Sequence, residues 1–597
     1  MKKIIIKINT EFGETISKTI NFDDFEEKND KISLPKYIET NSEDIKKKYI
    51  DLVNSFPNYR NKKKKIIDNF NFEKNKNFFW ISDFYEKSLY KNTTLINQFE
   101  LIALDKLFNE IDLNKVFIEI SDFNFRISVQ NICKSKNINF QIINTKIFSI
   151  NFKLNSFLTI ILSFLKFLIF CSKRISIRGK IDWNFLKKQN IKNIFINYSA
   201  YTDIDKSNSF NSEYWKELLK NHDLINNTLW FNIYSLNQKF TYKKFVEYQN
   251  LINHNKKYFI YSIEQLLNFK IFLKILYSWL KNCYFYILNR KYIKFYLKQK
   301  NSEYLHNFFL KDLDKSFLGL DSAVNFYYFY LFKNLSNNLD LNKNIFYLYE
   351  NQSWEKSLVY NFKGKSKLVA VNHASIRYWD LRFCSDENCE KDVIPDVYAV
   401  NGDDSKQKLL NENYPIEKIN KIEALRYFHI LSDTKQNKKF ENENNILLVS
   451  DYSDKSNENL LQAIGKIEKN ILSNYKFTLK EHPLKSININ NYSYINKTNL
   501  NFAELRKNNK IAIVSNTTSA VLDLYLLNYK IISIMDNNSI NLSPMRKSRN
   551  ISFLYNHNEI TKILKNCKLD ENNFEINNFF YLNRDLRFWK NILDANK

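Results

Sequence analysis

The sequence IAIVSNTTSAVLDLYL at residues 511–526 joins a short apolar run to a helical pattern through a few polar residues. Apolar and mostly β-branched residues fill Ile511–Val514, which predicts a buried strand. The hydroxyl and amide residues of Ser515–Ser519 predict a loop that starts a helix, because such side chains accept hydrogen bonds from free helix amides. A strand that leads directly into a helix is the repeating unit of a parallel sheet. The stretch therefore predicts an α/β fold.

The same alternation recurs along the chain in two series. In the first series we expect strands near Val116–Ile120, Phe140–Ile143, Asn193–Asn197, Leu229–Tyr234, Ile345–Tyr349, Lys367–Val371 and Val397–Val400. In the second series we expect Ile446–Ser450, Tyr475–Lys480, Ile511–Ser515 and Ile531–Met535. The polar stretch Ser432–Asn445 separates the two series, and 597 residues are too many for one core. We therefore expect an N-terminal α/β lobe over 1–435 and a C-terminal α/β lobe over 440–597.

The composition limits the partners. Lys and Arg number 90 against 64 Asp and Glu, a net charge of +26. This charge suits nucleic acid, an anionic membrane or an anionic substrate, or it reflects codon bias spread over solvated faces. No zinc-finger, RRM-like or basic-zipper pattern is present, so nucleic acid is disfavoured. Six scattered cysteines and an N-terminus without the apolar core of a signal peptide predict a reduced, cytoplasmic protein.

Two segments interrupt the α/β pattern as helical insertions at about 150–180 and 260–335. Phe157–Cys171 is nearly all apolar and is followed by cations, but about 15 residues are too few to span a bilayer. Leu266–Leu297 mixes aromatic residues with lysines. Such helices suit a peripheral contact with the inner face of the cytoplasmic membrane, or a buried helix pair. Replacing Phe164, Leu165 and Phe167 with Ser is expected to release a membrane-bound chain.

Several enzyme classes are disfavoured by missing motifs. Glycines stand only at 13, 179, 319, 364, 402 and 465, so neither a GxGxxG nor a Walker loop exists. GxSxG and HExxH are also missing. No Asp-x-Asp pair follows a predicted strand in a metal-binding setting, so we expect no metal ion and no cofactor.

The stretch KFTLKEHP at residues 476–483 places chemistry at a strand end. The strand ends at Lys480, because Pro483 cannot donate to a ladder. Ligands of open α/β sheets bind beyond the carboxyl ends of the strands. Lys480 and His482 are therefore candidates to hold a phosphate or a nucleotide leaving group, although a solvated turn would look the same.

The loop Ser515-Asn516-Thr517-Thr518-Ser519 comes one strand–helix unit later. Hydroxyls and free amides at a helix start form an anion site, although ordinary N-capping needs the same residues. If both loops lie at one sheet edge, they can face the same phosphate.

These two loops resemble the HP and S motifs of bacterial GT-B glycosyltransferases, including sialyltransferases and related enzymes with CMP-activated donors. The resemblance implies that both motifs hold the donor nucleotide. His482 and Pro483 match the HP motif, and Ser515, Asn516, Thr517, Thr518 and Ser519 match the S motif. Asp523 stands where many of these enzymes hold a ribose hydroxyl, or it complements a helix dipole.

Segments of the first series extend the resemblance over most of the chain from about residue 75. They are Phe79–Ser82, Asn211–Trp215, Tyr347–Lys356, Val371–Asp380, Asp396–Gly402 and Ile422–Tyr427. Together they resemble surface-carbohydrate biosynthesis glycosyltransferases of bacterial O-antigen or capsule type. The resemblance implies a GT-B fold in which two Rossmann-like lobes face a cleft. The final helix, near Tyr581–Ala595, is expected to cross back to the first lobe.

Candidate catalytic residues follow strand ends of the first series. Glu350, Glu355, His373 and Asp380 could each take the proton of an acceptor hydroxyl, with Glu350 preferred because it directly ends a strand. Arg377, Arg426 and Ser450 are expected to support the site. Alternatively, Glu355 complements a helix dipole, and Arg377 and Asp380 form a structural ion pair.

The sequence thus predicts a metal-independent glycosyltransferase that moves a sugar from a nucleotide sugar to a glycan or lipid-linked acceptor. The donor could carry CMP. Two alternatives stay open, a CDP-polyol phosphotransferase of similar layout and a non-catalytic GT-B-like scaffold.

Overall fold

A computed structural model describes most of the chain. It covers residues 4–594 apart from 10–17, 24, 26, 28–29, 62–63, 144–155, 176–180, 200–201, 205–209, 235–241, 255–257, 341, 385–390, 434–443, 484, 537–539, 547, 549–550 and 567–575. Most of the polar stretch expected to separate the lobes lies outside the described residues.

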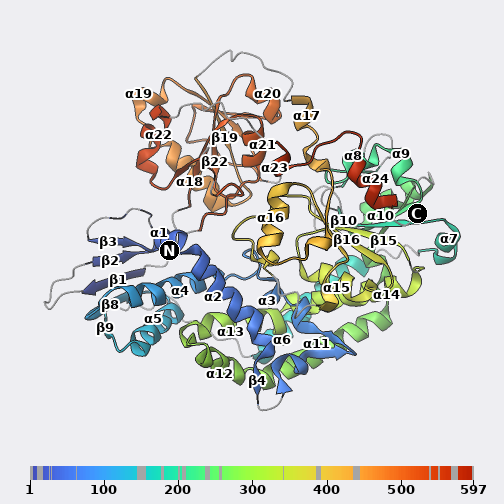
Figure 1. The fold of residues 1–597 in the computed structure, drawn as a ribbon, viewed down its shortest axis with the longest axis horizontal. Helices are drawn as coiled ribbons and strands as arrows, with labels where there is room; N and C mark the ends of the chain where they lie inside the picture. The colour runs from blue at the N-terminus through green and yellow to red at the C-terminus, as the bar shows by residue number, and fades with distance from the viewer. Residues whose placement is uncertain are drawn as a thin grey trace.

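Two parallel sheets form the frame of the molecule (Figure 1). The first has seven strands in the order β14 (Phe259–Ser262), β13 (Thr228–Ile233), β10 (Asn193–Tyr198), β15 (Asn344–Leu348), β16 (Lys367–Val371), β17 (Val397–Val400) and β18 (Ile419–Lys421). The second has six, β21 (Ile495–Thr498), β20 (Lys476–Lys480), β19 (Asn445–Val449), β22 (Ile511–Ser515), β23 (Lys530–Ile534) and β24 (Ile551–Leu554). All neighbours within each sheet pair in parallel.

These sheets confirm the expected α/β fold of GT-B type, with two Rossmann-like units. Their central strands are buried along their whole length, as in Asn344–Leu348 and Ile511–Ser515. Continuous burial explains why apolar runs rather than alternating patterns marked these strands, because helices cover both faces of a parallel sheet. The division at 435–440 remains an expectation.

The first two predicted strands belong elsewhere. β8 (Lys115–Ile120) and β9 (Asn139–Ile142) join a separate five-stranded sheet with β1 (Ile4–Asn9), β2 (Lys18–Asn21) and β3 (Lys31–Ser33). The expectation that they begin the first lobe's parallel series is therefore wrong in this detail. β8 pairs antiparallel with β1, which comes more than a hundred residues earlier. No local sequence pattern indicates a pairing over that distance.

Helices connect and cover these sheets. They are α1 (Leu34–Thr40), α2 (Ser42–Ser55), α3 (Asp83–Glu86), α4 (Leu95–Glu110), α5 (Phe123–Ser135), α7 (Trp183–Lys188), α8 (Lys216–Leu219), α9 (His222–Ile225), α10 (Tyr242–His254), α15 (Ser353–Phe362), α16 (Asp403–Asn411), α17 (Ile430–Asp433), α18 (Asp454–Ile464), α19 (Lys469–Leu472), α20 (Phe502–Arg506), α21 (Ala520–Leu526), α22 (Ile560–Asn566), α23 (Ile576–Phe579) and α24 (Arg587–Asp594).

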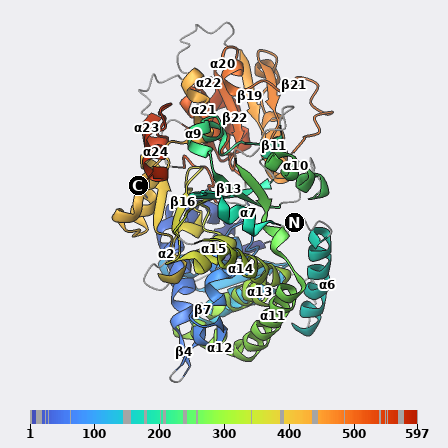
Figure 2. The same ribbon diagram turned by 90° about the vertical axis from the view of Figure 1, so that its right-hand side faces the viewer.

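The two predicted insertions form a helical layer below the first sheet (Figure 2). It contains α6 (Ser156–Ile175), α11 (Phe269–Asn289), α12 (Lys291–Gln299), α13 (His306–Leu318) and α14 (Leu320–Asn338). α6 is 20 residues long, so the expected length of about 15 was too short. Its segment Ser156–Arg174 is long and apolar enough to cross a membrane by length and composition, with a mean hydropathy of 1.8.

α6 is neither wholly buried nor wholly exposed. Phe167 is fully buried, where its ring stacks on Phe272 of α11 with 6.1 Å between centroids. Leu165 on the opposite face is half exposed. The substitution set expected to test membrane binding therefore combines core with surface residues and cannot separate membrane contact from stability.

The end of the chain returns to the first lobe, as expected. Trp589 of α24 is buried in the core of the seven-stranded sheet, with its ring 5.8 Å from Trp215 and 6.0 Å from Phe346. The returning segment lies against the first lobe, where the Tyr581 amide donates to the Asn401 carbonyl at 2.8 Å. The two sheets are therefore joined by two passages of the chain.

Gly402 is the residue that admits the returning segment. A Cβ atom at this position would lie 1.9 Å from the Phe579 carbonyl oxygen. The backbone of Gly402 is extended, with φ of −173°, so close approach and not unusual backbone geometry requires glycine.

We predict that Gly402→Ala lowers the free energy of unfolding by about 1–3 kcal/mol, because backbone must move to admit the methyl group. Gly465→Ala is the matched control, since its Cβ would meet its nearest atom at 3.5 Å. Denaturant unfolding followed by circular dichroism measures both. Equal stability of the two variants would show that the crossing tolerates a side chain.

Candidate functional site

The carboxyl ends of the two parallel sheets face each other. Arg377 follows β16 in the first lobe, and Asp451 follows β19 in the second. Burial raises the pKa of Asp451, while the positive charges of Arg377 and His482 oppose this rise. Arg377 also acts electrostatically on Tyr427, in the segment that connects the lobes. The two strand edges are therefore close enough to form one site.

Some of the buried side-chain polar atoms without a hydrogen-bond partner in the described residues lie at these edges. They are Asn372 Oδ1, His373 Nδ1, Arg377 Nη1 and Asn401 Nδ2 in the first lobe, and Asp451 Oδ2, Ser515 Oγ and Asn516 Oδ1 in the second. A buried polar atom without a partner costs about 1–3 kcal/mol, so native proteins keep few of them without a reason. Their position at the strand ends indicates a polar binding site.

Glu350 lies at the centre of a charged cluster in the first lobe. Its Oε1 is 3.3 Å from His373 Nε2, and its Oε2 accepts hydrogen bonds from Arg382 at 2.9 Å and Gln352 at 2.5 Å. Burial alone would raise the pKa of Glu350, but the hydrogen bond from His373 and the charge of Arg382 outweigh it. The pKa is held well below its usual range. Glu350 is therefore a charged hydrogen-bond acceptor and a weak proton acceptor.

Glu355 and Asp380 have structural partners. The buried Glu355 carboxylate accepts from the backbone amides of Glu350 and Asn351 at 3.1 and 3.0 Å. Burial and then the charge of Glu350 raise the pKa of Glu355 well above its ordinary value. Asp380 accepts two bonds from Arg382 at 2.7 Å. The alternative of an Arg377–Asp380 ion pair is therefore wrong, because Arg382 takes the Asp380 carboxylate.

His373 has one ring nitrogen fixed and one without a partner. The Glu350 carboxylate can only accept, so Nε2 carries the proton of this contact. Nδ1 has no hydrogen-bond partner among the described residues. The Tyr214 ring packs edge-on against the imidazole at 4.7 Å and lies 5.7 Å from the Arg426 guanidinium. Arg426 in turn acts electrostatically on His482, which connects the two halves of the site.

His482 lies at the edge of the second lobe, as the sequence predicted. Its backbone amide donates to Ser450 Oγ at 2.8 Å, so Ser450 fixes the loop that holds it. The imidazole packs against the exposed ring of Tyr452 at 5.7 Å. Burial lowers the pKa of His482, and Asp451 opposes this shift. The imidazole is therefore mostly neutral at pH 7.

Lys480 and Pro483 do not join this arrangement. The Lys480 ammonium donates to the Leu500 carbonyl at 2.6 Å and lies over the Phe502 ring. The ammonium lies on the side of β21 and α20, because β20 neighbours the edge strand β21 in the sheet. Pro483 is exposed. The expectation that Lys480 shares a phosphate with His482 is not met in this geometry.

The Ser515–Ser519 loop divides into buried and partly exposed residues. Ser515 and Asn516 are buried, and Asn516 Nδ2 donates to the Ile540 carbonyl at 3.3 Å. Thr518 Oγ1 accepts from the Ala520 amide at 3.3 Å, while the N-cap residue Ser519 makes no side-chain cap hydrogen bond. Thr517 and Ser519 are partly exposed.

Asp523 reaches the segment between the lobes. Its Oδ1 lies 3.1 Å from His429 Nε2. The sequence motifs missed His429, Arg382 and Asp451, although Asp380 and Arg382 stand two residues apart as partners often do in an extended loop. Arg382 also pairs with Glu350, 32 residues away, and a local motif cannot contain such a contact.

A cavity of about 940 Å³ adjoins the site at Arg377. Residues of α2, the 376–384 loop, α16 and the 543–548 loop line it. Three of its other cations, Lys46, Lys408 and Arg546, lie 2.6, 2.7 and 2.6 Å from carboxylate oxygens of Glu412, Asp404 and Glu39. Lys47 also lines the cavity. Most of its cations are therefore paired, which suits an uncharged group.

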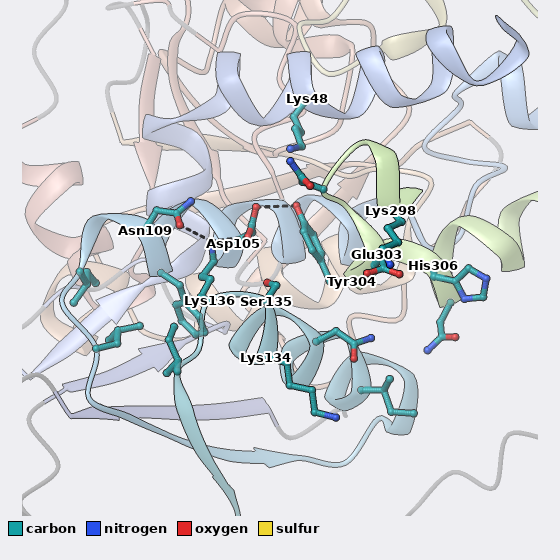
Figure 3. Close-up of a pocket in the computed structure, with 18 of the residues that line it drawn as sticks. Lys48, Asp105, Asn109, Lys134, Ser135, Lys136, Lys298, Glu303, Tyr304 and His306 are labelled. Carbon is teal, nitrogen blue, oxygen red and sulfur yellow. Dashed lines mark hydrogen bonds and ion pairs between the residues drawn. The ribbon is translucent and has the colours of Figure 1, made fainter. Parts of the chain in front are cut away.

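A second cavity, of about 1370 Å³, lies in the N-terminal region among α4, α5 and α12 (Figure 3). Lys136 pairs with Asp105 at 2.9 Å, and Tyr304 donates to the same carboxylate at 3.1 Å. None of the sequence-predicted site residues lines this cavity. We therefore place the candidate site at the facing sheet edges.

Within the described part of the chain, no group of three His, Cys, Asp or Glu side chains is arranged to hold a metal ion. The metal-independent chemistry expected from the sequence stays a prediction.

No protein-family model and no curated protein matches the sequence. Several solved structures are similar in arrangement. UDP-GlcNAc 2-epimerase from Methanocaldococcus jannaschii, with UDP-GlcNAc and UDP, has 12% identity and a TM-score of 0.37 over 68% of this chain and 99% of its own. MnaA of S. aureus with UDP has 10% identity and a TM-score of 0.38 over 68% and 97%. HepE of Anabaena with UDP and glucose has 9% identity and a TM-score of 0.30 over 63% and 90%.

At this level of similarity nothing about the chemistry of this chain is inferred from these structures. Neither sequence comparison supports the resemblance to sialyltransferase-like or O-antigen-type enzymes, which remains an expectation.

We predict that nucleotide affinity rises as pH falls through about 6.5, the ordinary pKa of histidine. A phosphate favours the charged imidazole, so binding must raise the lowered pKa of His482 and take up a proton. His482→Gln should weaken nucleotide binding about ten-fold at pH 6 and flatten the pH dependence.

Calorimetry with UDP and CMP between pH 5.5 and 8 measures this effect. His557→Gln is the matched control, because burial also lowers the pKa of His557 in the same lobe. Retention of the pH dependence in the His482 variant would contradict the assignment.

Proposed function

We propose that this protein is a GT-B glycosyltransferase that moves a sugar from a nucleotide sugar to an acceptor hydroxyl in the cleft between the two sheets. The acceptor is a growing surface glycan or a lipid-linked glycan. The nucleotide binds to the second lobe, and the acceptor enters from the first.

One observation carries the proposal. Arg377 projects a guanidinium from the first lobe, and its Nη1 is buried without a hydrogen-bond partner among the described residues. A buried charged group left partly unpaired is costly, so an anion that spans both lobes would complete it. Across the cleft, Arg426 and His482 lie within electrostatic range of each other. The diphosphate or phosphate of a nucleotide sugar supplies such an anion.

His373 is the proposed base. Glu350 binds Nε2 and would stabilise the imidazolium that forms when Nδ1 takes a proton. This revises the preference for Glu350, whose lowered pKa leaves it little tendency to accept a proton. Glu355, Asp380 and Arg382 hold Glu350 and its loop in place.

The departing nucleotide would be stabilised by cations and polar groups of both lobes. Arg377 and Arg426 remain charged at any working pH, and His482 can gain charge when phosphate approaches. The Ser515 hydroxyl, buried without a partner at the same edge, can donate to the phosphate, whereas Asn516 Oδ1 can only accept. Asp523, held by His429, is placed to accept from a ribose hydroxyl at the start of α21.

The first test is a product analysis with the purified chain. Radiolabelled CMP-, UDP- and GDP-sugars are incubated with lipid-linked glycan acceptors, and both free nucleotide and glycan are resolved. We expect sugar to enter the acceptor with release of the nucleotide. Transfer of phosphate together with a polyol from CDP-glycerol would instead support the phosphotransferase. Absence of nucleotide binding would support the scaffold.

We predict that His373→Asn lowers kcat about 10²- to 10⁴-fold while the nucleotide Kd stays within about two-fold, because a general base contributes to transfer and not to donor binding. Glu350→Gln should lower kcat less and shift its pH profile, since it keeps the geometry but removes the negative charge. Steady-state kinetics and calorimetry separate the two effects. A parallel loss of binding in His373→Asn would assign His373 to donor binding instead.

We predict that activity survives EDTA. Protein cations take the place of a metal at the leaving phosphate, so chelation should change kcat/KM less than about two-fold. Initial rates with and without EDTA, and after addition of Mg²⁺ or Mn²⁺, measure this. Activity that disappears and returns with the added metal would show that the protein cations do not suffice.

A further inference from the structure

The outward face of α6 is apolar in a helical pattern. Leu158, Leu162, Leu165 and Ile169 are exposed at intervals of three or four residues, and Leu165 keeps half of its surface. The opposite face carries Phe167, Cys171 and Arg174, which are buried. One helix therefore presents a continuous apolar stripe to the outside while it packs on the protein.

α11 continues this surface. Leu273, Tyr277, Leu280 and Tyr284 are exposed at the same spacing, and Tyr277 keeps 69% of its surface. Two side-chain contacts join the helices. Phe167 stacks on Phe272, and Arg290 beyond the end of α11 donates to Ser156 Oγ at 3.3 Å. α6 and α11 therefore run antiparallel at the outer edge of the helical layer (Figure 2) and form one apolar surface, called here the α6–α11 face.

The helices that form this face carry charges of one sign. α6 and α11 contain Lys and Arg residues and no Asp or Glu. Lys166, Lys270 and Lys274 are exposed beside the apolar residues. Exposed aromatic and aliphatic residues bordered by lysines match the interface of a bilayer with anionic headgroups.

Two other roles fit this face less well. A second copy of the chain would bring two cationic surfaces together, and like charges oppose such a contact. Spanning by α6 would need it to leave its packing, where Phe167 is buried on Phe272 and the Tyr327 ring, and the Arg174 guanidinium lies 5.7 Å from the Tyr234 ring. The face can enter the headgroup layer with these contacts intact.

We propose that the α6–α11 face docks the protein on an anionic lipid bilayer, with both helices parallel to the membrane plane. Apolar insertion and lysine–headgroup attraction provide the two signals that stable peripheral attachment needs. The inference does not depend on the proposed transferase activity, because docking requires no substrate.

The test is flotation of the full-length protein with vesicles. Vesicles of phosphatidylcholine with added phosphatidylglycerol, an anionic lipid, are compared with pure phosphatidylcholine. We expect binding to the anionic vesicles at least ten-fold stronger than to the neutral ones. High salt should weaken it without abolishing it, because salt screens the charges and not the apolar contact.

Two triple variants make the test specific. Leu165→Asp/Ile169→Asp/Leu273→Asp should lower the anionic vesicle affinity at least ten-fold. The control Leu251→Asp/Ile416→Asp/Leu500→Asp changes three similarly exposed leucines and isoleucines elsewhere by the same charge, and should lower it far less. If the first variant unfolds, Leu165→Ser/Leu273→Ser replaces it, with an expected loss of at least three-fold.

Failure of the wild-type protein to bind anionic vesicles would overturn the proposal. An equal loss in both triple variants would also overturn it, since added negative charge alone would then explain the result. A dimer in lipid-free buffer that only the first variant disrupts, seen by analytical ultracentrifugation, would assign the face to a second copy.

Discussion

The arrangement of the two lobes depends on one buried carboxylate. Glu423, between the lobes, accepts hydrogen bonds from the backbone amides of Phe588 and Trp589 at 2.9 and 3.0 Å. Its own carbonyl accepts from the Trp589 indole at 3.0 Å. A carboxylate at the start of α24 satisfies free amides and complements the helix dipole. Because α24 comes from beyond the second lobe, this contact fixes the outgoing and returning chain together.

The candidate site follows from that constraint. Once the lobes are joined at Glu423, the carboxyl ends of both parallel sheets face one space, and polar residues that follow the strands meet there. Arg377 and Asp451 follow strands of different sheets, yet the positive charge of Arg377 acts on the Asp451 carboxyl. The first lobe supplies a histidine fixed by a carboxylate, and the second supplies groups suited to phosphate. Neither lobe alone holds both parts.

Much of the frame was predictable from the sequence, and less of the site. Buried parallel strands are continuous apolar runs, so Lys367–Val371, Val397–Val400 and Ile511–Ser515 were located to the residue. β1, in contrast, gave no sign of its distant partner β8. His482 and His373 were found because they follow strands. Two details depend on neighbours that no local pattern specifies. The Lys480 side chain points to the Leu500 carbonyl, and Asp380 pairs with Arg382 and not with Arg377.

The returning segment that passes Gly402 has a consequence for the relative motion of the two lobes. The segment near Ala424 and the segment near Tyr581 run side by side, joined by the Ala424 amide and the Tyr581 carbonyl at 2.9 Å. A single connecting strand would let the lobes swivel in any direction. Two strands in contact act as a ribbon, which bends across its flat side and resists shear along its width. The two lobes are therefore restricted largely to opening about one axis. A substrate that enters the cleft then meets the two sheet edges in a fixed relative position.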